Sequence, residues 1–136
     1  MMVYFDTNVL IYAFTKNIDD SKQSEISISL VEEAIDTETL IVSEVTLCEF
    51  AFVSHKMNED KNDIDDNLEF LSTFLQVSNF SVNQRILEIL KDKSLYTSSF
   101  DIYHLAFAEY HNVRLVTFDK GFKKLQNISK IKIDIK

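Results

Sequence analysis

The chain has 136 residues, of which 46% are hydrophobic, so one globular domain spanning residues 1–136 is predicted and a disordered chain is excluded. The formal net charge of −8 argues against nucleic-acid binding through the whole surface. The single cysteine, Cys48, excludes an internal disulfide and a cysteine-based zinc site, and the lack of a membrane-length apolar run or a secretory signal pattern predicts a cytoplasmic protein with no membrane partner.

The first half of the chain alternates predicted strands and helices. Val3, Tyr4 and Phe5 suit a buried strand, because β-branched and aromatic side chains pack well on a pleated surface. The elements expected after it are a helix over Val9–Phe14, a helix over Ser21–Ile35, a buried strand at Leu40–Val42 and a helix from Ser43 to about His55. A polar break is predicted at Asn58–Asp66, followed by a helix that carries Leu68, Leu71, Phe74 and Leu75.

The second half continues this alternation. The expected elements are a weak strand at Phe80–Val82, a helix that carries Ile86, Leu87 and Leu90, a helix over Asp101–Tyr110, a strand at Val113–Phe118, a helical turn at Phe122–Leu125 and an edge strand at Ile131–Ile135. Alternating strands and helices predict a parallel α/β sheet with helices on both faces.

Charge is distributed unevenly along the chain. Residues 1–113 carry seven Lys or Arg against twenty Asp or Glu, a net charge of −13, whereas residues 114–136 carry seven against two, a net charge of +5. The basic C-terminal segment is a candidate surface for a phosphate backbone. A solvated helix and tail without any partner explains the same pattern equally well.

Four acidic residues lie in settings that differ from solvated surface. Asp6 lies at the end of the first predicted strand, and Asp119 lies in the same way at the end of the predicted strand that includes Leu115–Phe118. Glu49 lies inside the most apolar helix, and Asp101 opens another apolar helix. Each one alone has a structural explanation, as a helix cap, a turn residue, a helix N-terminal charge or a helix-edge group. Together they are expected on the same side of a parallel sheet.

Four carboxylates that converge in this way would repel one another and raise each other's pKa. A divalent cation removes this repulsion, and oxygen ligands select Mg²⁺ or Mn²⁺ over zinc. Such an ion activates water and stabilises a leaving oxygen, so the chemistry that follows is phosphodiester hydrolysis.

The same segments resemble the motifs of PIN domains, and the most similar subgroup is the VapC-type toxins of prokaryotic toxin–antitoxin pairs. The motifs that carry the resemblance are Tyr4–Tyr12, Glu49-Phe50, Ser99-Phe100-Asp101 and Leu115–Asp119. The resemblance covers nearly the whole chain. It implies a three-layer α/β/α sandwich with a central, mostly parallel sheet of four to five strands. It also implies a Mg²⁺- or Mn²⁺-dependent endoribonuclease, an antitoxin partner and a homodimer.

The resemblance also implies roles for individual residues. The catalytic and metal-binding acids would be Asp6, Glu49, Asp101 and Asp119, of which Asp6 and Asp101 are the firmest ligands. The polar residues that fall where the family often orients such ligands are Asn8, Ser43 and Thr117. RNA is expected to approach along Lys120, Lys123 and Lys124. The chain departs from the family at His111-Asn112, where glycines commonly precede the next strand.

Two other functions are compatible with the sequence: a housekeeping PIN nuclease that processes RNA or DNA without an antitoxin, and a catalytically silent RNA- or protein-binding module. Other motifs are weaker. Asp60–Asp66 lacks the glycine and the closing glutamate of a calcium loop, and Asp6-Thr7-Asn8 lacks the second Asp of a haloacid-dehalogenase phosphatase. No glycine-rich phosphate loop exists. The three histidines lack ligand spacing, and His104 is interpreted as a packed or hydrogen-bonded helix residue.

Overall fold

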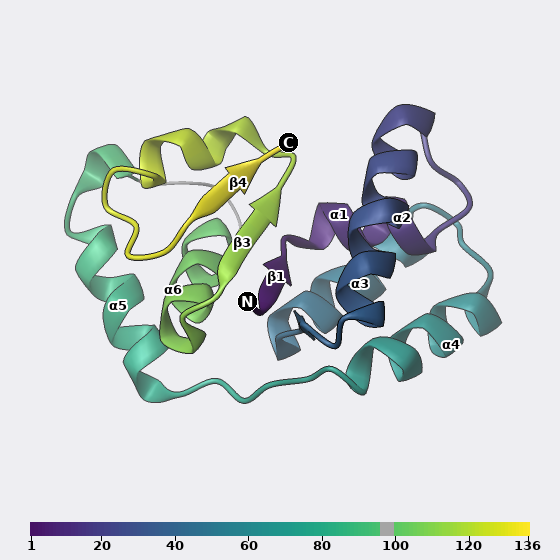
Figure 1. Ribbon diagram of the computed structural model, residues 1–136, viewed down its shortest axis with the longest axis horizontal. Coiled ribbons are helices and arrows are strands. Elements are labelled where there is room, and N and C mark those ends of the chain that lie inside the picture. The colour runs from purple at the N-terminus through teal and green to yellow at the C-terminus, as the bar shows by residue number, and fades with distance from the viewer. Residues whose placement is uncertain (96–99) are drawn as a thin grey trace.

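The structure of the protein is a computed structural model that describes residues 1–95 and 100–136. Ser99 of the motif Ser99-Phe100-Asp101 therefore lies outside the described residues. The described residues contain a four-stranded sheet in the order β2-β1-β3-β4, in which every neighbouring pair is parallel (Figure 1). The strands are β1 (Val3–Phe5), β2 (Leu40–Ile41), β3 (Arg114–Thr117) and β4 (Ile133–Ile135).

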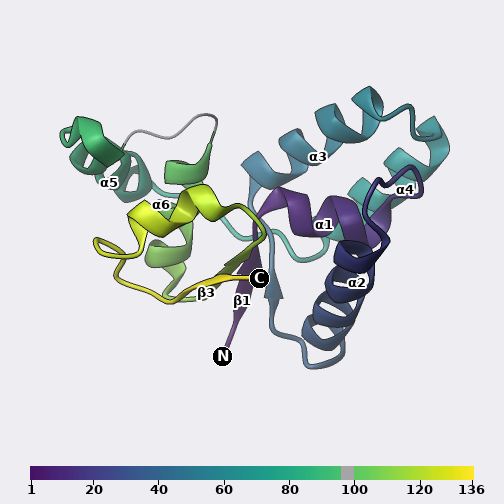
Figure 2. The same cartoon turned by 90° about the horizontal axis from the view of Figure 1, so that it is seen from above.

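Helices cover both faces of this sheet (Figure 2). On one side lie α1 (Thr7–Phe14), α2 (Ser21–Asp36), α3 (Glu44–Lys56) and α4 (Lys61–Ser72). On the other side lie α5 (Phe80–Leu90), α6 (Asp101–His111) and the short 3-10 helices η1 (Lys93–Leu95) and η2 (Lys120–Leu125). This arrangement confirms the predicted three-layer α/β/α sandwich. None of the helices in the described part of the chain is long and apolar enough to cross a membrane.

Alternation along the strands supplies two hydrophobic cores. Val3 and Phe5 pack with residues of α1, α2 and α3 on one face of the sheet. Tyr4, between them, points to the other face and packs with residues of α6 and η2. Because successive side chains of a strand point to opposite faces, a one-residue slip of β1 would empty both cores. Full burial of each large side chain stabilises the fold by about 1.5–3 kcal/mol.

The strand order places a crevice beside β1. The chain passes from β1 to β2 on one side and then returns to β3 on the other side of β1. Ligands of open parallel sheets bind outside the carboxyl ends of the strands, at the point where the strand order reverses. The backbone N–H of Asp6 donates to Val116 O at 2.9 Å, so the pairing of β1 with β3 continues up to this edge.

The predicted polar break at Asn58–Asp66 is wrong for most of its length. The helix α4 begins at Lys61, and the carboxylate of Asp60 accepts hydrogen bonds from the backbone N–H groups of Asn62 and Asp63. The capping carboxylate satisfies backbone N–H groups that the first turn of a helix leaves without a partner. The acidic side chains that follow it lie on the solvent-facing side of the helix. Polar composition shows that this segment is solvated, whereas the capping side chain of Asp60 decides that it is helical.

The predicted strand at Phe80–Val82 is also wrong, because these residues form the first turn of α5. The side chain of Asn79 accepts a hydrogen bond from the backbone N–H of Ser81 at 2.9 Å and starts the helix there. The preceding helix is shorter than expected, since it ends at Ser72, and Leu75 instead forms an isolated parallel bridge with Val42.

Asn112 replaces the expected glycine at the end of α6. Its backbone adopts a φ of 53°, in the left-handed region that asparagine tolerates better than most residues. The N–H of Asn112 donates to Glu109 O at 3.1 Å, and the N–H of Val113 donates to Ala108 O at 3.0 Å. These bonds close the helix and direct the chain into β3.

Candidate active site

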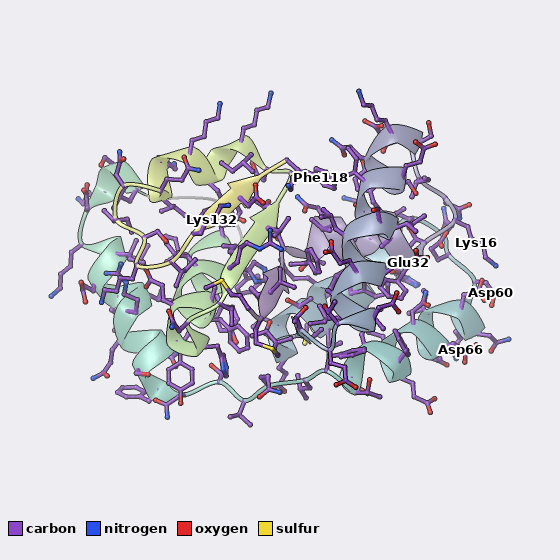
Figure 3. All side chains as sticks on the ribbon, viewed as in Figure 1. Lys16, Glu32, Asp60, Asp66, Phe118 and Lys132 are labelled. Carbon is purple, nitrogen blue, oxygen red and sulfur yellow. The ribbon has the colours of Figure 1, made fainter. Side chains whose placement is uncertain are left out.

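A cavity of about 460 Å³ opens at the carboxyl edge of the sheet, and five carboxylates line it: that of Asp19, which accepts a hydrogen bond from the Tyr12 hydroxyl, and the four selected from the sequence. Each of these four comes from a different part of the fold: Asp6 follows β1, Glu49 lies in α3, Asp101 begins α6 and Asp119 lies two residues after β3. Phe118, labelled in Figure 3, marks this edge of the sheet. The structure thus brings together the four acids selected from the sequence, and their roles as ligands stay predictions.

Asp6 is the most deeply buried of these acids, with 7% of its surface exposed. Its Oδ1 accepts a hydrogen bond from the backbone N–H of Thr7 at 2.8 Å, and its Oδ2 accepts one from the hydroxyl of Thr117 at 2.7 Å. Burial raises the pKa of Asp6 above its usual value, and the neighbouring charge of Glu49 adds to that rise. The nearby His104 and the hydrogen bond from Thr117 oppose it.

Glu49 is held through a single carboxylate oxygen. Its Oε1 accepts a hydrogen bond from the hydroxyl of Thr7 at 2.8 Å and lies 2.6 Å from His104 Nε2. Burial alone would raise the pKa of Glu49, but the contacts with His104 and Thr7 hold this pKa below its usual value. Glu49 is therefore ionised at neutral pH.

The ionised form of Asp101 is disfavoured by burial and by the neighbouring acids. Burial raises the pKa of Asp101 to about 6, and the negative charges of Asp6 and Asp119 contribute to the rise. At neutral pH the site holds several partly desolvated negative charges, and a cation among them would relieve the repulsion.

Asp119 lies at the exposed rim of the cavity. Its Oδ1 accepts a hydrogen bond from the backbone N–H of Gly121 at 2.7 Å and caps η2. The backbone N–H of Asp119 donates to the hydroxyl oxygen of Thr117 at 2.9 Å. Because the Thr117 hydroxyl also donates to Asp6, this one side chain connects two of the four acids.

The donor atoms of the cavity fit a hard divalent cation. Asn8 lines the cavity, and its buried Oδ1 has no hydrogen-bond partner among the described residues, which leaves an amide oxygen available to a ligand. Carboxylate and amide oxygens are donors that Mg²⁺ and Mn²⁺ prefer. Within residues 1–95 and 100–136, no three His, Cys, Asp or Glu side chains are arranged to hold a metal ion as they stand. Mg²⁺ is commonly held by one or two carboxylates together with water molecules, so such an ion needs fewer protein ligands.

The remaining residues named from the sequence do not line the cavity. Ser43 is completely buried at the start of α3, where its hydroxyl lies 2.7 Å from the hydroxyl of Tyr4. Lys120, Lys123 and Lys124 are exposed on η2, directly after Asp119. Their contact with RNA stays a prediction.

The sequence did not indicate that His104 contacts the acids of this site. The imidazole is 1% exposed and lies between Glu49 and the hydroxyl of Tyr4. The expectation of a packed, hydrogen-bonded helix residue is confirmed, but its partner is an acid of the cavity. One signal was present: residues three apart share a helix face, so His104 follows Asp101 on the same side of α6.

Comparisons with known proteins agree with this fold. The profile of the PIN domain family matches residues 3–128. No curated protein sequence matches the chain significantly. One similar solved structure is VapBC2 from Rickettsia felis bound to a promoter DNA fragment, with 20% identity, a TM-score of 0.72 and coverage of 100% of this chain and 99% of that chain. FitAcB from Neisseria gonorrhoeae is similar with 16% identity, a TM-score of 0.69 and coverage of 98% of this chain and 96% of that chain. A toxin–antitoxin complex from Klebsiella pneumoniae has 21% identity, a TM-score of 0.62 and coverage of 89% of this chain and 90% of that chain. At these identities the likeness shows the fold alone.

Proposed function

The chain belongs to the PIN domain family, and on that basis we propose that it is a Mg²⁺- or Mn²⁺-dependent endoribonuclease. The observation that carries the proposal is the cavity at the carboxyl edge of the sheet, where four separate elements contribute Asp6, Glu49, Asp101 and Asp119. The buried oxygen of Asn8 in the same cavity has no hydrogen-bond partner within residues 1–95 and 100–136, and this supports a ligand there.

The protein residues would divide the work of phosphodiester hydrolysis. When bound, a divalent ion would supply an activated water and stabilise charge on the phosphate oxygens. Asp6 and Asp101 would hold the ion, and Glu49 and Asp119 would complete the site directly or through water. Thr117 would keep the carboxylate of Asp6 in place, because it donates to Oδ2 at 2.7 Å.

We also propose that the protein is the toxin of a toxin–antitoxin pair. One of the similar solved structures is a toxin–antitoxin complex, which supports a protein partner for this chain. The net charge of −13 over residues 1–113 suits a partner that docks through a basic segment. A homodimer and a cytoplasmic location accompany this proposal.

Cleavage of a labelled RNA tests the catalytic proposal. Wild-type protein, Asp6→Asn and the control Asp66→Asn are incubated with Mg²⁺ or with EDTA; Asp66 is exposed on α4, away from Phe118 at the cavity edge (Figure 3). Wild type and Asp66→Asn should cleave only with Mg²⁺, and Asp6→Asn should lose more than about 100-fold in rate. Equal cleavage by Asp6→Asn, or cleavage that survives EDTA, would contradict the proposal.

Three further assays separate the alternatives. Cleavage of a single-stranded DNA of the same sequence as readily as of RNA would favour a nuclease of broader substrate range. The product of a small gene directly upstream should co-purify with this protein and suppress cleavage if the protein is a toxin. A chain with no such neighbour, but with the same Mg²⁺-dependent activity, would be a housekeeping nuclease. Failure to bind Mn²⁺ by calorimetry would favour a silent binding module.

A further inference from the structure

A buried histidine connects the acidic cavity to the interior of the protein. His104 lies in α6, three residues after Asp101, and is 1% exposed. Its Nε2 lies 2.6 Å from Glu49 Oε1 and 3.8 Å from Asp6 Oδ1. Its Nδ1, on the other side of the ring, lies 2.5 Å from the hydroxyl oxygen of Tyr4. The imidazole is thus next to two of the four acids without itself lining the cavity.

Behind the imidazole, three buried hydroxyl groups form a cluster. The hydroxyl oxygen of Tyr4 lies 2.7 Å from Ser43 Oγ and 2.9 Å from Thr46 Oγ1, and all three residues are 0% exposed. The ring of Tyr4 also packs against Phe107, with their centroids 4.8 Å apart. Tyr4 is therefore fixed both by its ring and by its hydroxyl.

The contacts of this cluster hold both sides of the imidazole ring. The backbone N–H of Thr46 donates to Ser43 Oγ at 3.0 Å, and the Ser43 hydroxyl donates to Thr46 Oγ1 at 3.0 Å. Because the carboxylate of Glu49 can only accept, Nε2 of His104 is the donor in the contact between them. On the other side of the ring, the Tyr4 hydroxyl is hydrogen-bonded to Nδ1.

We infer that His104 and Tyr4 are positioning residues that fix the carboxylate of Glu49 for the reaction proposed above, and the inference rests on that proposed function. His104 and Thr7 both donate to Oε1, so the carboxylate cannot rotate without losing two hydrogen bonds. Neither bond falls on Oε2, which leaves that oxygen for the cavity. Tyr4, which is hydrogen-bonded to Nδ1, keeps the imidazole in the orientation that this geometry requires.

Two amide substitutions separate the two sides of the ring. In His104→Gln the side-chain amide reaches the position of Nε2 and can still donate to Glu49. In His104→Asn the shorter amide reaches only the position of Nδ1. We expect His104→Gln to keep kcat within about 10-fold and His104→Asn to lose about 100-fold, with KM for RNA unchanged in both. The affinity for Mn²⁺, measured by calorimetry without RNA, should fall in the same order.

The variant Tyr4→Phe keeps the packing against Phe107 and removes only the hydroxyl. Nitrogen NMR of the His104 ring reports which nitrogen carries the proton, with neither RNA nor metal present. We expect a proton on Nε2 in the wild type. Tyr4→Phe should weaken the order of the ring, seen as a broader Nε2 signal, and lower the Mn²⁺ affinity by about 10-fold.

A destabilised variant away from the cavity serves as the control. Ile89→Ala removes a buried side chain of α5, which does not line the cavity, so it should lower stability without changing kcat or Mn²⁺ affinity. Equal losses in His104→Gln and His104→Asn, or a wild-type ring with no proton on Nε2, would overturn the inference. If the wild type cleaves no RNA, the proposed function fails, while the NMR and Mn²⁺ measurements still decide the positioning role.

Discussion

Asp6 combines a structural and a chemical task at the end of β1. Its Oδ1 caps α1 through the backbone N–H of Thr7, and its Oδ2 receives the hydroxyl of Thr117. The neighbouring residues go beyond capping: the hydroxyl of Thr7 donates to Glu49, and the buried oxygen of Asn8 has no partner in the part of the chain that the structure describes. A capping role accounts for the contacts of Asp6, but it does not account for the positions of the side-chain oxygens of Thr7 and Asn8.

Asp101→Asn is predicted to abolish RNA cleavage and yet to stabilise the metal-free protein by about 1 kcal/mol. Burial, with the charges of Asp6 and Asp119, raises the pKa of Asp101 to about 6, so the folded state disfavours the charged carboxylate. Water screens this half-buried group, so the gain stays below the roughly 1.4 kcal/mol per pKa unit of a fully buried one. Urea unfolding in EDTA measures the stability, with Asp66→Asn as the control.

The stability difference between these two proteins should depend on pH. The folded pKa of about 6 lies above the unfolded value of about 4. The wild type therefore loses stability relative to Asp101→Asn as the pH rises from about 4 to about 6. The advantage of the variant should be full at about pH 7 and absent near pH 4. A variant that is less stable than the wild type at neutral pH would contradict this account.

Thr117→Val tests the hydroxyl that connects two acids. Thr117 is 0% exposed, donates to Asp6 and accepts from the backbone N–H of Asp119. We expect Thr117→Val to cost about 1–3 kcal/mol in unfolding free energy and about 10- to 100-fold in cleavage rate. Thr117→Ser retains the hydroxyl and should recover most of the rate. Equal rates for the Val and Ser variants would show that the hydroxyl does not matter.

The four acids could be selected from the sequence because each interrupts an apolar segment. His104 could not be selected in the same way, because a histidine within the apolar helix α6 is equally consistent with simple packing. Its role depends on Tyr4 and Glu49, which lie 100 and 55 residues away in the chain. Contacts between such distant residues follow from the packing of α6 on β1 and α3, which local patterns do not encode.

At the scale of elements, the strands were easier to predict than the helix boundaries. Val3–Phe5 is a strand as predicted, and Ile133–Ile135 confirms the alternating C-terminal strand, since both patterns reflect burial on a sheet. Helix starts depend instead on single capping side chains. Asp60 and Asn79 each begin a helix within sequence that was predicted as a loop or a strand. Short polar segments therefore gave the largest errors.

The turn at Asn112 gives a prediction at this scale. Asn112 adopts a φ of 53°, which costs most L-residues about 1–2 kcal/mol. Asn112→Val should lower the unfolding free energy by about that amount, whereas Asn112→Gly should preserve or raise it. Thermal unfolding compares the three proteins. Equal stability of the Val and Gly variants would mean that the left-handed turn is not kept in solution.

At the scale of the whole molecule, acidic and basic residues lie next to each other at one edge of the sheet. The strand order gathers the acids at one edge, while the basic residues that follow Asp119 lie on η2 at the rim of the same edge. A negative cavity concentrates divalent cations, and the adjacent lysines can offset its repulsion of a phosphate backbone. If the protein acts on RNA as proposed, this arrangement would let a chain of net charge −8 meet a phosphate backbone over a limited surface.

The double variant Lys120→Ala/Lys123→Ala tests that surface. Both lysines are exposed on η2. Their loss should weaken RNA binding at low salt and reduce the slope of log affinity against log salt concentration by about 1.4 for single-stranded RNA, since each lysine contributes about 0.7. Lys61→Ala, on the exposed side of α4, is the matched control. An unchanged salt slope would place the RNA path elsewhere on the molecule.

The most direct test of the central claim is the position of Mn²⁺ in crystals soaked with the ion, located by anomalous scattering. The account predicts Mn²⁺ in the cavity, coordinated by Asp6 and Asp101, in the wild type, and its loss in Asp6→Asn. Mn²⁺ bound only outside this cavity, at a concentration that supports RNA cleavage, would contradict it.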